Sequence, residues 1–192
     1  MEKGLNINSA KTKVMVMSKC QQIPRTEIRC GDQVVEQVDS SKYLGSTVTS
    51  NVKCETEIRR RIEIAKCSFI NLKKLLKNGK LSIKTRKRLA KSRVWSTLLY
   101  GAGTRTLSGA ITKKLEAVEM WFWRRLLKIP WTDRKTNAEV LNIVGEEKCL
   151  VKEVRKRQLK FFGHVMRREG LEKGVVTGLI EGSRGKGRPR DK

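Results

Sequence analysis

The sequence has few carboxylates and no run of apolar residues long enough to cross a bilayer. Aspartate occurs only at positions 32, 39, 133 and 191, and Glu146-Glu147 is the one pair of adjacent acidic residues. Nucleotidyl transfer needs carboxylates that converge on metal ions, so this scarcity argues against self-contained catalysis. The sequence also has no P-loop, GxSxG or HExxH motif and does not open on a signal peptide.

Histidine and paired cysteines are also scarce. The chain has one histidine, His164, and five cysteines at irregular spacing without a CxxC motif. An odd set of unpaired thiols is typical of a reducing compartment, which predicts a nuclear or cytoplasmic protein. Structural zinc sites take four cysteine or histidine ligands, so no zinc site is expected. We therefore expect no cofactor in this chain, no small-molecule substrate and no membrane partner.

The excess in this sequence is positive charge. Its 192 residues include 44 Lys and Arg against 19 Asp and Glu, a formal net charge of +25. Residues 51–100 contain 15 basic and 3 acidic residues, and residues 151–192 contain 13 and 5, so these segments hold +12 and +8 of the net charge. Charge clustered in this way predicts a polyanionic partner, RNA or DNA.

The first 48 residues alternate between apolar and polar side chains, which predicts short strands. Residues 13–18 and 27–38 alternate, and Gly31-Asp32 lies inside the second run as a two-residue hairpin turn. A third strand is predicted over residues 42–47. Such a β unit is too small to be stable alone.

Helical periodicity begins at Glu55. Apolar residues three or four apart predict an amphipathic helix over residues 55–77, closed at Asn78-Gly79 with Gly79 in a left-handed cap. Its inward stripe is expected to be Ile58, Ile62, Ala65, Phe69, Leu72 and Leu76. Ser82 is predicted to cap a second helix that runs to Tyr100, so that the two form a hairpin with a basic outside.

Three further helices are predicted. Ser108 starts one that ends before Pro130, and its inward stripe is Ile111, Leu115, Val118, Phe122 and Leu126. Thr136 and Glu139 match a capping box for a short helix closed by Gly145. The last covers residues 147–168, with Leu150, Val154, Phe161 and Val165 inward. The predicted fold class is α+β and predominantly helical, with a small N-terminal antiparallel β unit.

The basic residues of the first two helices are the main candidates for phosphate contact. They are Arg59, Arg60, Arg61, Lys66, Lys73, Lys74, Arg86, Lys87 and Arg88. A solvated helix face is the alternative, but by count acidic partners at i,i+4 are nearly missing, which favours phosphate contact. With about 6–10 phosphates contacted, affinity should fall about 10³–10⁵-fold between 50 and 200 mM salt.

Aromatic residues stand beside basic ones further along the chain. Trp121 and Trp123 flank Phe122 and precede Arg124-Arg125, and either base stacking or core packing fits the two tryptophans. Phe122 lies on the apolar stripe and is expected to pack. Arg167 and Arg168 extend the basic side. Arg188 and Arg190, in a Gly/Arg/Lys tail predicted to be mobile, fit either a phosphate backbone or a nuclear-localisation tract.

A series of segments resembles one family in order. GLNIN, followed by Lys11-Thr12-Lys13 and VMVM, resembles the segment after the catalytic strand in reverse transcriptases of non-LTR, LINE-like retrotransposons. Residues 42–45 (KYLG) resemble the primer-grip hairpin that follows. The segments ETEIRRRIEIA, WSTLLYGAGTRTL, WFWRRLLKIPW, a TxxEVL box, LKFFGHVMRR and the terminal GKGRPR continue in family order. The resemblance covers essentially the whole chain.

This resemblance implies a division of the chain. Residues 1–48 would be the end of the palm, with Tyr43, Leu44 and Gly45 as primer grip and Lys11 near the incoming nucleotide. Residues 49–107 would be a thumb-like basic helical hairpin, 108–170 a C-terminal helical region and 171–192 a basic tail. The basic helices would then hold the template–primer duplex of RNA and DNA.

Two departures from the family pattern change the expected activity. The metal-binding aspartates of the palm are expected upstream of Met1, so Mg²⁺ is expected only for the complete polymerase. Gly103 and Arg105 stand where relatives usually have an acidic residue and a tryptophan. The resemblance therefore implies a polymerase fragment that binds template–primer without extending it. A domesticated RNA- or DNA-binding module and a non-functional transposon remnant remain as alternatives.

Overall fold

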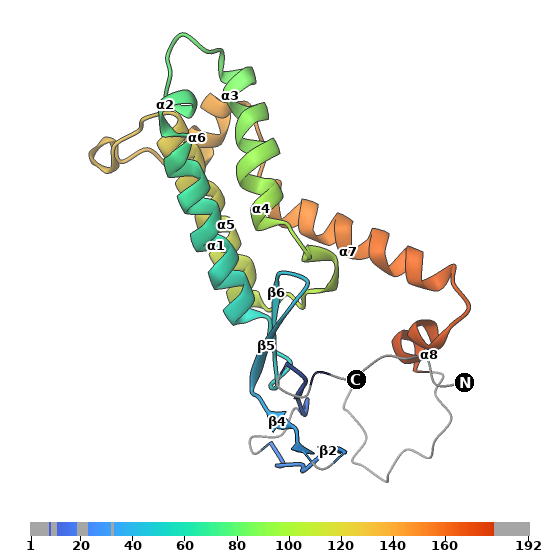
Figure 1. Ribbon diagram of the computed structural model, residues 1–192. Helices are drawn as coiled ribbons and strands as arrows, with labels where there is room; N and C mark the ends of the chain where they lie inside the picture. Colours follow the sequence, from blue (N-terminus) through green and yellow to red (C-terminus); the bar gives the residue numbers. More distant parts are fainter. Residues whose placement is uncertain (1–7, 9–10, 19–22, 32, 179–192) are drawn as a thin grey trace.

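A computed structural model describes residues 8, 11–18, 23–31 and 33–178 of the chain. Of these residues, 57% are helical and 10% lie in strands, which confirms a predominantly helical α+β fold. Short strands form the base of the molecule and an upright helical bundle stands above them (Figure 1).

The strands pair two by two. They are β1 (Lys13–Val14), β2 (Arg29–Cys30), β3 (Gln33–Val34), β4 (Glu36–Gln37), β5 (Ser40–Tyr43) and β6 (Ser46–Thr49). β2 and β3 pair antiparallel around the expected turn, where Gly31 has φ +61°; Asp32 lies outside the described residues. β1 pairs with β4 in parallel, with Lys13 opposite Glu36, so the expectation of a wholly antiparallel unit was wrong. Alternation defines the faces of a strand but not the direction of its partner.

The third predicted strand is a hairpin. Instead of one strand over residues 42–47, β5 and β6 pair antiparallel from Ser40–Thr49 to Tyr43–Ser46. Leu44 (φ 46°) and Gly45 (φ 75°) form the two-residue turn. Positive φ at both positions is the type I′ geometry that matches the twist of a hairpin.

Within the described residues, the helical part contains eight α-helices, one π-helix and two 3₁₀ turns. They are α1 (Glu55–Asn71), α2 (Lys73–Leu76), α3 (Ile83–Leu89), the π-helical η1 (Ala90–Trp95), α4 (Ser96–Leu98), the 3₁₀ turn η2 (Ala102–Thr104), α5 (Gly109–Leu126), the 3₁₀ turn η3 (Trp131–Asp133), α6 (Asn137–Val144), α7 (Leu150–Met166) and α8 (Leu171–Thr177).

Side-chain caps mark the N-termini of α3, α5 and α6, as the sequence predicted. Ser82 and Ser108 accept backbone N–H groups at 3.1 and 3.3 Å, and Thr136 with Glu139 forms the predicted capping box. The first helix departs from prediction, because α1 ends at Asn71 and α2 forms a separate turn. Gly79 does not have positive φ, so its predicted left-handed cap was wrong.

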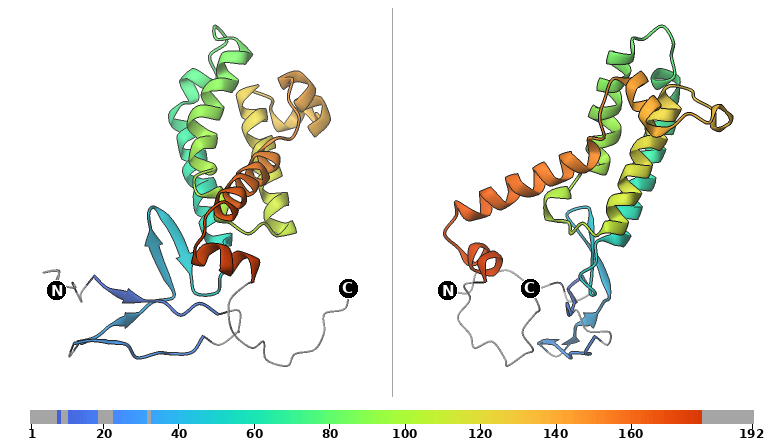
Figure 2. Two further views of the ribbon diagram at one scale, coloured as in Figure 1. Left: turned by 90° about the vertical axis from the view of Figure 1, so that its right-hand side faces the viewer. Right: turned by 180° about the vertical axis from the view of Figure 1, so that it is seen from behind.

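One core joins the helices. The predicted stripes of α1 and α5 are buried except for half-buried Leu72, and they share a single cluster with side chains of η1, α4, α6 and α7. Figure 2 shows α7 leaving the bundle toward α8. Phe161 of α7 is 44% exposed and is not part of the core cluster, so the prediction that it faces the core was wrong. Residues 171–177, expected to be tail, form α8; Arg188 and Arg190 lie outside the described residues.

A buried carboxylate fixes the start of α7. Glu119 of α5 is fully buried and accepts the N–H groups of Cys149 and Leu150 at 2.9 and 3.1 Å. A carboxylate at this end of a helix satisfies free N–H groups and complements the helix dipole. Burial, together with the charge of Glu119, raises the pKa of the Cys149 thiol to about 12.

Candidate nucleic-acid interface

The tip of the β5–β6 hairpin presents apolar side chains to solvent. Tyr43 is 69% exposed and Leu44 is 75% exposed. Leu44 also occupies the left-handed backbone region, which favours glycine and costs other residues on the order of 1–3 kcal/mol. A strained, exposed leucine persists only where the surrounding structure holds it in place.

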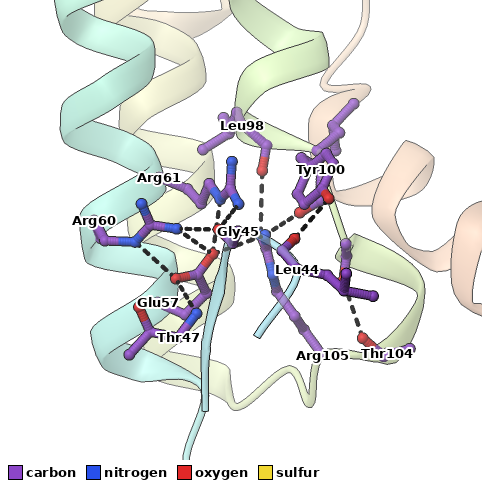
Figure 3. A network of polar contacts seen from close by, with 12 residues as sticks. Leu44, Gly45, Thr47, Glu57, Arg60, Arg61, Leu98, Tyr100, Thr104 and Arg105 are labelled. Atoms are coloured by element: carbon purple, nitrogen blue, oxygen red, sulfur yellow. Dashed lines mark hydrogen bonds and ion pairs between the residues drawn. The ribbon is translucent and has the colours of Figure 1, made fainter. Parts of the chain in front are cut away.

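That support comes from the helical bundle (Figure 3). Arg60 and Arg61 of α1 both donate to the carbonyl oxygen of Gly45, the former at 2.6 Å. The hydroxyl of Tyr100 donates to the carbonyl oxygen of Leu44 at 2.7 Å, and the Arg61 guanidinium carbon lies 4.4 Å from the Tyr100 ring centroid. Two side chains of α1 and one from the turn after α4 therefore fix the backbone of the hairpin turn.

Glu57 organises the arginines. Its carboxylate is 3% exposed and accepts Arg60 Nε at 2.9 Å, Arg61 Nε at 2.7 Å and the Thr47 N–H at 2.9 Å. Burial by itself would raise the pKa of Glu57, but the hydrogen bonds from both arginines and Thr47 outweigh it and lower the pKa to about 2. The carboxylate is thus ionised and joins α1 to β6.

Arg105 completes this network from the far side. Its guanidinium donates to the carbonyl oxygens of Leu98 (3.1 Å) and Tyr100 and lies 3.7 Å from a Glu57 oxygen. Burial lowers the pKa of Arg105, and the charge of Glu57 partly opposes that effect. In the sequence, Arg105 stands out only as a departure from the family pattern, because its partners lie up to 48 positions away and no local pattern indicates them.

The absence of a side chain at position 103 also has a structural reason. A Cβ at this position would lie 3.2 Å from the Phe161 Cβ and 3.3 Å from the Arg157 carbonyl oxygen, so η2 meets α7 closely here. Arg157 donates to the Leu99 carbonyl oxygen at 3.0 Å beside this contact. A larger residue would separate α7 from the bundle.

The premise that acidic partners are missing from the first helix was wrong. Arg59 pairs with Glu55 at 3.3 Å, and Lys66 pairs with Glu63 at 2.8 Å, in addition to the pairs of Glu57. Three glutamates within the nine residues 55–63 are enough to pair these cations, because each lies one turn from a cation. Exposed pairs of this kind are weak, so Arg59 can still exchange its partner for a phosphate.

Arg86 and Lys87 work inside the fold. Arg86 donates to the Leu126 carbonyl oxygen at 3.0 Å, at the end of α5, and Lys87 donates to the Val144 carbonyl oxygen at 2.9 Å, at the end of α6. Cations at helix C-termini satisfy free carbonyl groups. Lys87 also pairs with Glu146 at 3.2 Å. Neither side chain is the free phosphate ligand that the sequence suggested.

The exposed cations of the helical hairpin lie further along. Lys73 and Lys74 on α2 and Arg88 on α3 are exposed, and among the described residues no carboxylate pairs with them. Lys11, before β1, and Arg167 and Arg168, after α7, are exposed at other places in the chain. Of the predicted phosphate-contacting cations, those of the helical hairpin therefore lie on one part of the molecule, whereas Lys11, Arg167 and Arg168 lie elsewhere.

The two tryptophans differ. Trp123 is fully buried against Trp95, with ring centroids 5.5 Å apart, so base stacking at Trp123 is excluded and core packing holds. Trp121 is half-buried, and the guanidinium carbon of Arg125 lies 4.2 Å from its ring. Arg124 donates to the Lys135 carbonyl oxygen at 2.8 Å and to Asn137 at 2.9 Å.

The described residues do not provide a metal centre. No group of three His, Cys, Asp or Glu side chains among them is placed to hold an ion, so the donor set does not fit the Mg²⁺ of a polymerase and no step is assigned to it. Within the same residues, none of the helices is both long and apolar enough to cross a membrane.

Comparison with known proteins gives one informative similarity. No protein-family model matches the sequence, and no solved structure matches it. The chain is 28% identical over 175 residues to an uncharacterized transposon-derived protein of Caenorhabditis elegans. The alignment covers 88% of this chain and 61% of that protein, so the chain spans less than two thirds of its relative. This similarity fits a transposon origin for the chain.

Proposed function

We propose that the chain is a template–primer binding part of a LINE-like reverse transcriptase. The observation that carries the proposal is the β5–β6 tip, where exposed Tyr43 and strained Leu44 are fixed to the bundle by Arg60, Arg61 and Tyr100. Rigid apolar side chains at a fixed turn suit packing against the sugar and base edge of a primer end. The transposon-derived relative and the order of family-like segments support the same assignment.

In this proposal cations of the helical hairpin contact the duplex backbone. They are exposed Arg59, Lys73, Lys74 and Arg88, together with half-buried Lys66. The hairpin tip is held near the start of α1, and the cations of α2 follow its end. Because the 17 residues of α1 extend about 25 Å, a duplex would have to contact the tip and the α2 cations at well-separated points along its length. About five phosphates neutralised give a slope of about −4.5 in log K against log salt, or roughly a 500-fold loss of affinity between 50 and 200 mM.

A salt titration of binding to a blunt RNA–DNA hybrid tests the proposal. We expect Lys74→Ala/Arg88→Ala to reduce the slope by about two units. Arg155→Ala/Lys156→Ala removes the same charge from exposed positions on α7 and should leave the slope unchanged. A flat salt dependence, or equal effects of both double variants, would contradict the assignment.

The proposal assigns binding and no polymerisation. In a primer-extension assay with Mg²⁺ or Mn²⁺ we expect no cDNA from this chain, and robust synthesis would overturn that part. The transposon-derived relative equally favours a remnant, or a domesticated binding module. Saturable preference for one structured RNA over random RNA at physiological salt would favour the domesticated module.

A further inference from the structure

A second basic site lies at the other end of the bundle. A groove of about 790 Å³ is bounded by the end of α2 and by the α5–α6 loop. Its ten lining residues include six cations and no carboxylate; the cations are Lys77, Arg124, Arg125, Lys128, Arg134 and Lys135. Figure 1 shows this loop projecting from the bundle near α6, far from the hairpin.

The positive charges are close enough to affect one another. Burial lowers the pKa of Lys77, and the charges of Lys73, Arg125 and Lys128 lower it further. Arg124 holds the loop through its bonds to Lys135 and Asn137. A concave surface with cations and no lining anion favours a polyanion.

The loop displays a tryptophan on a strained backbone. Trp131 is 92% exposed. Lys128 (φ 60°) and Arg134 (φ 47°) bracket it, and both adopt the left-handed region without being glycine. Two such residues cost on the order of 1–3 kcal/mol each and are typical of ligand-binding segments. An exposed indole beside cations is the arrangement that binds unpaired bases.

We propose that this groove binds a single-stranded nucleic acid, with an unpaired base stacked on Trp131 and adjacent phosphates on Lys128 and Arg134. A duplex does not suit the site, because its base faces are already covered by neighbouring bases. Lys77 is sixteen residues beyond Arg61, on the order of 24 Å along helical backbone, so the groove and the hairpin tip are separate sites. The inference therefore goes beyond duplex binding and does not depend on it.

Binding of labelled 12-nucleotide oligo(U) and oligo(dT) to the full chain, followed by fluorescence anisotropy, tests the base contact. We expect Trp131→Ala to weaken binding of single strands roughly 5- to 150-fold, as for the loss of one stacked base, and Trp131→Phe to restore most of the affinity. Affinity for a blunt RNA–DNA hybrid should not change. Bound strands should quench tryptophan fluorescence, and the Trp131→Ala variant should lose this quenching.

A double variant tests the phosphate contacts. Lys128→Gly/Arg134→Gly removes two cations and suits the left-handed backbone, so folding is preserved while the salt slope for single strands should fall by about 1.4. Arg155→Ala/Lys156→Ala is the charge-matched control and should leave it unchanged. A loss of affinity for oligo(U) or for oligo(dT) in these variants supports the site and shows whether it prefers RNA or DNA. An unchanged affinity for both oligonucleotides, or an equal loss for the hybrid, would overturn it. If the chain bound the hybrid only weakly but bound single strands in a Trp131-dependent way, only the proposed duplex function would be refuted.

Discussion

Replacing Leu44 by asparagine separates the stability of the hairpin tip from its function. At φ 46° a leucine costs on the order of 1–3 kcal/mol, whereas asparagine visits this region more readily and would precede Gly45 in the preferred Asn-Gly turn. Because Leu44 is 75% exposed, little buried area is lost. We expect Leu44→Asn to stabilise the protein by about 1 kcal/mol, which raises Tm by about 2–4 °C at this size.

The same substitution should weaken duplex binding. If the leucine side chain packs against a primer, its removal should cost about 1.5–3 kcal/mol, or at least about tenfold in affinity for an RNA–DNA hybrid. Thermal unfolding and anisotropy on the same sample measure both effects. An unchanged or lower Tm would refute the strain, and unchanged affinity would refute the contact.

Val52 provides the matched control. It is also left-handed (φ 58°) and 45% exposed, but it lies in the β6–α1 connection rather than at the tip. Val52→Asn should relieve comparable strain and raise Tm, and it should leave hybrid affinity unchanged. Equal loss of affinity in both variants would attribute the effect to flexibility and not to the tip.

Two further substitutions test the network and the close helix contact. Glu57→Gln should lower the free energy of unfolding at pH 7 by about 3–5 kcal/mol, because it leaves buried arginines unpaired. The pKa of Glu57 is lowered in the fold, so its contribution to the free energy of unfolding is complete above about pH 4.5 and is lost as pH falls toward 2. In urea unfolding at several pH values from 7 to 3, the free energy of unfolding should therefore fall less with decreasing pH for Glu57→Gln than for the exposed-pair control Glu63→Gln. Gly103→Ala should cost about 1–3 kcal/mol through overpacking, whereas Gly109→Ala, which meets nothing within 4 Å, should be neutral or stabilising, as thermal unfolding of both would show.

The features that the sequence predicted are local ones. The stripes of α1 and α5, the caps at Ser82, Ser108 and Thr136, and the turn at Gly31 depend on residues within one or two turns of the chain. The exposed positions of Lys73, Lys74 and Arg88 follow from the same periodicity.

The features that it missed depend on distant partners. Glu119 meets the start of α7 about 30 positions later, and Trp123 is buried by Trp95 of a different helix. A basic run looks the same in sequence whether its side chains face solvent or reach a carbonyl group across the bundle. This ambiguity is greatest in the Arg86-Lys87-Arg88 run.

Adjacent residues of that run should therefore respond differently. Arg86→Ala removes a charge-assisted bond to the Leu126 carbonyl oxygen, 40 positions away, and should cost about 1.5–3 kcal/mol in urea unfolding. Arg88 is exposed, so Arg88→Ala should change stability by less than about 0.5 kcal/mol.

Binding should show the reverse order. Arg88→Ala should reduce the salt slope for an RNA–DNA hybrid by about one unit, whereas Arg86→Ala should leave it unchanged at temperatures where the variant is folded. If Arg86→Ala reduced the slope and Arg88→Ala did not, the phosphate-contacting side of α3 would be the opposite one. The duplex would then have to displace the cation that closes α5, which would couple binding to loosening of the bundle.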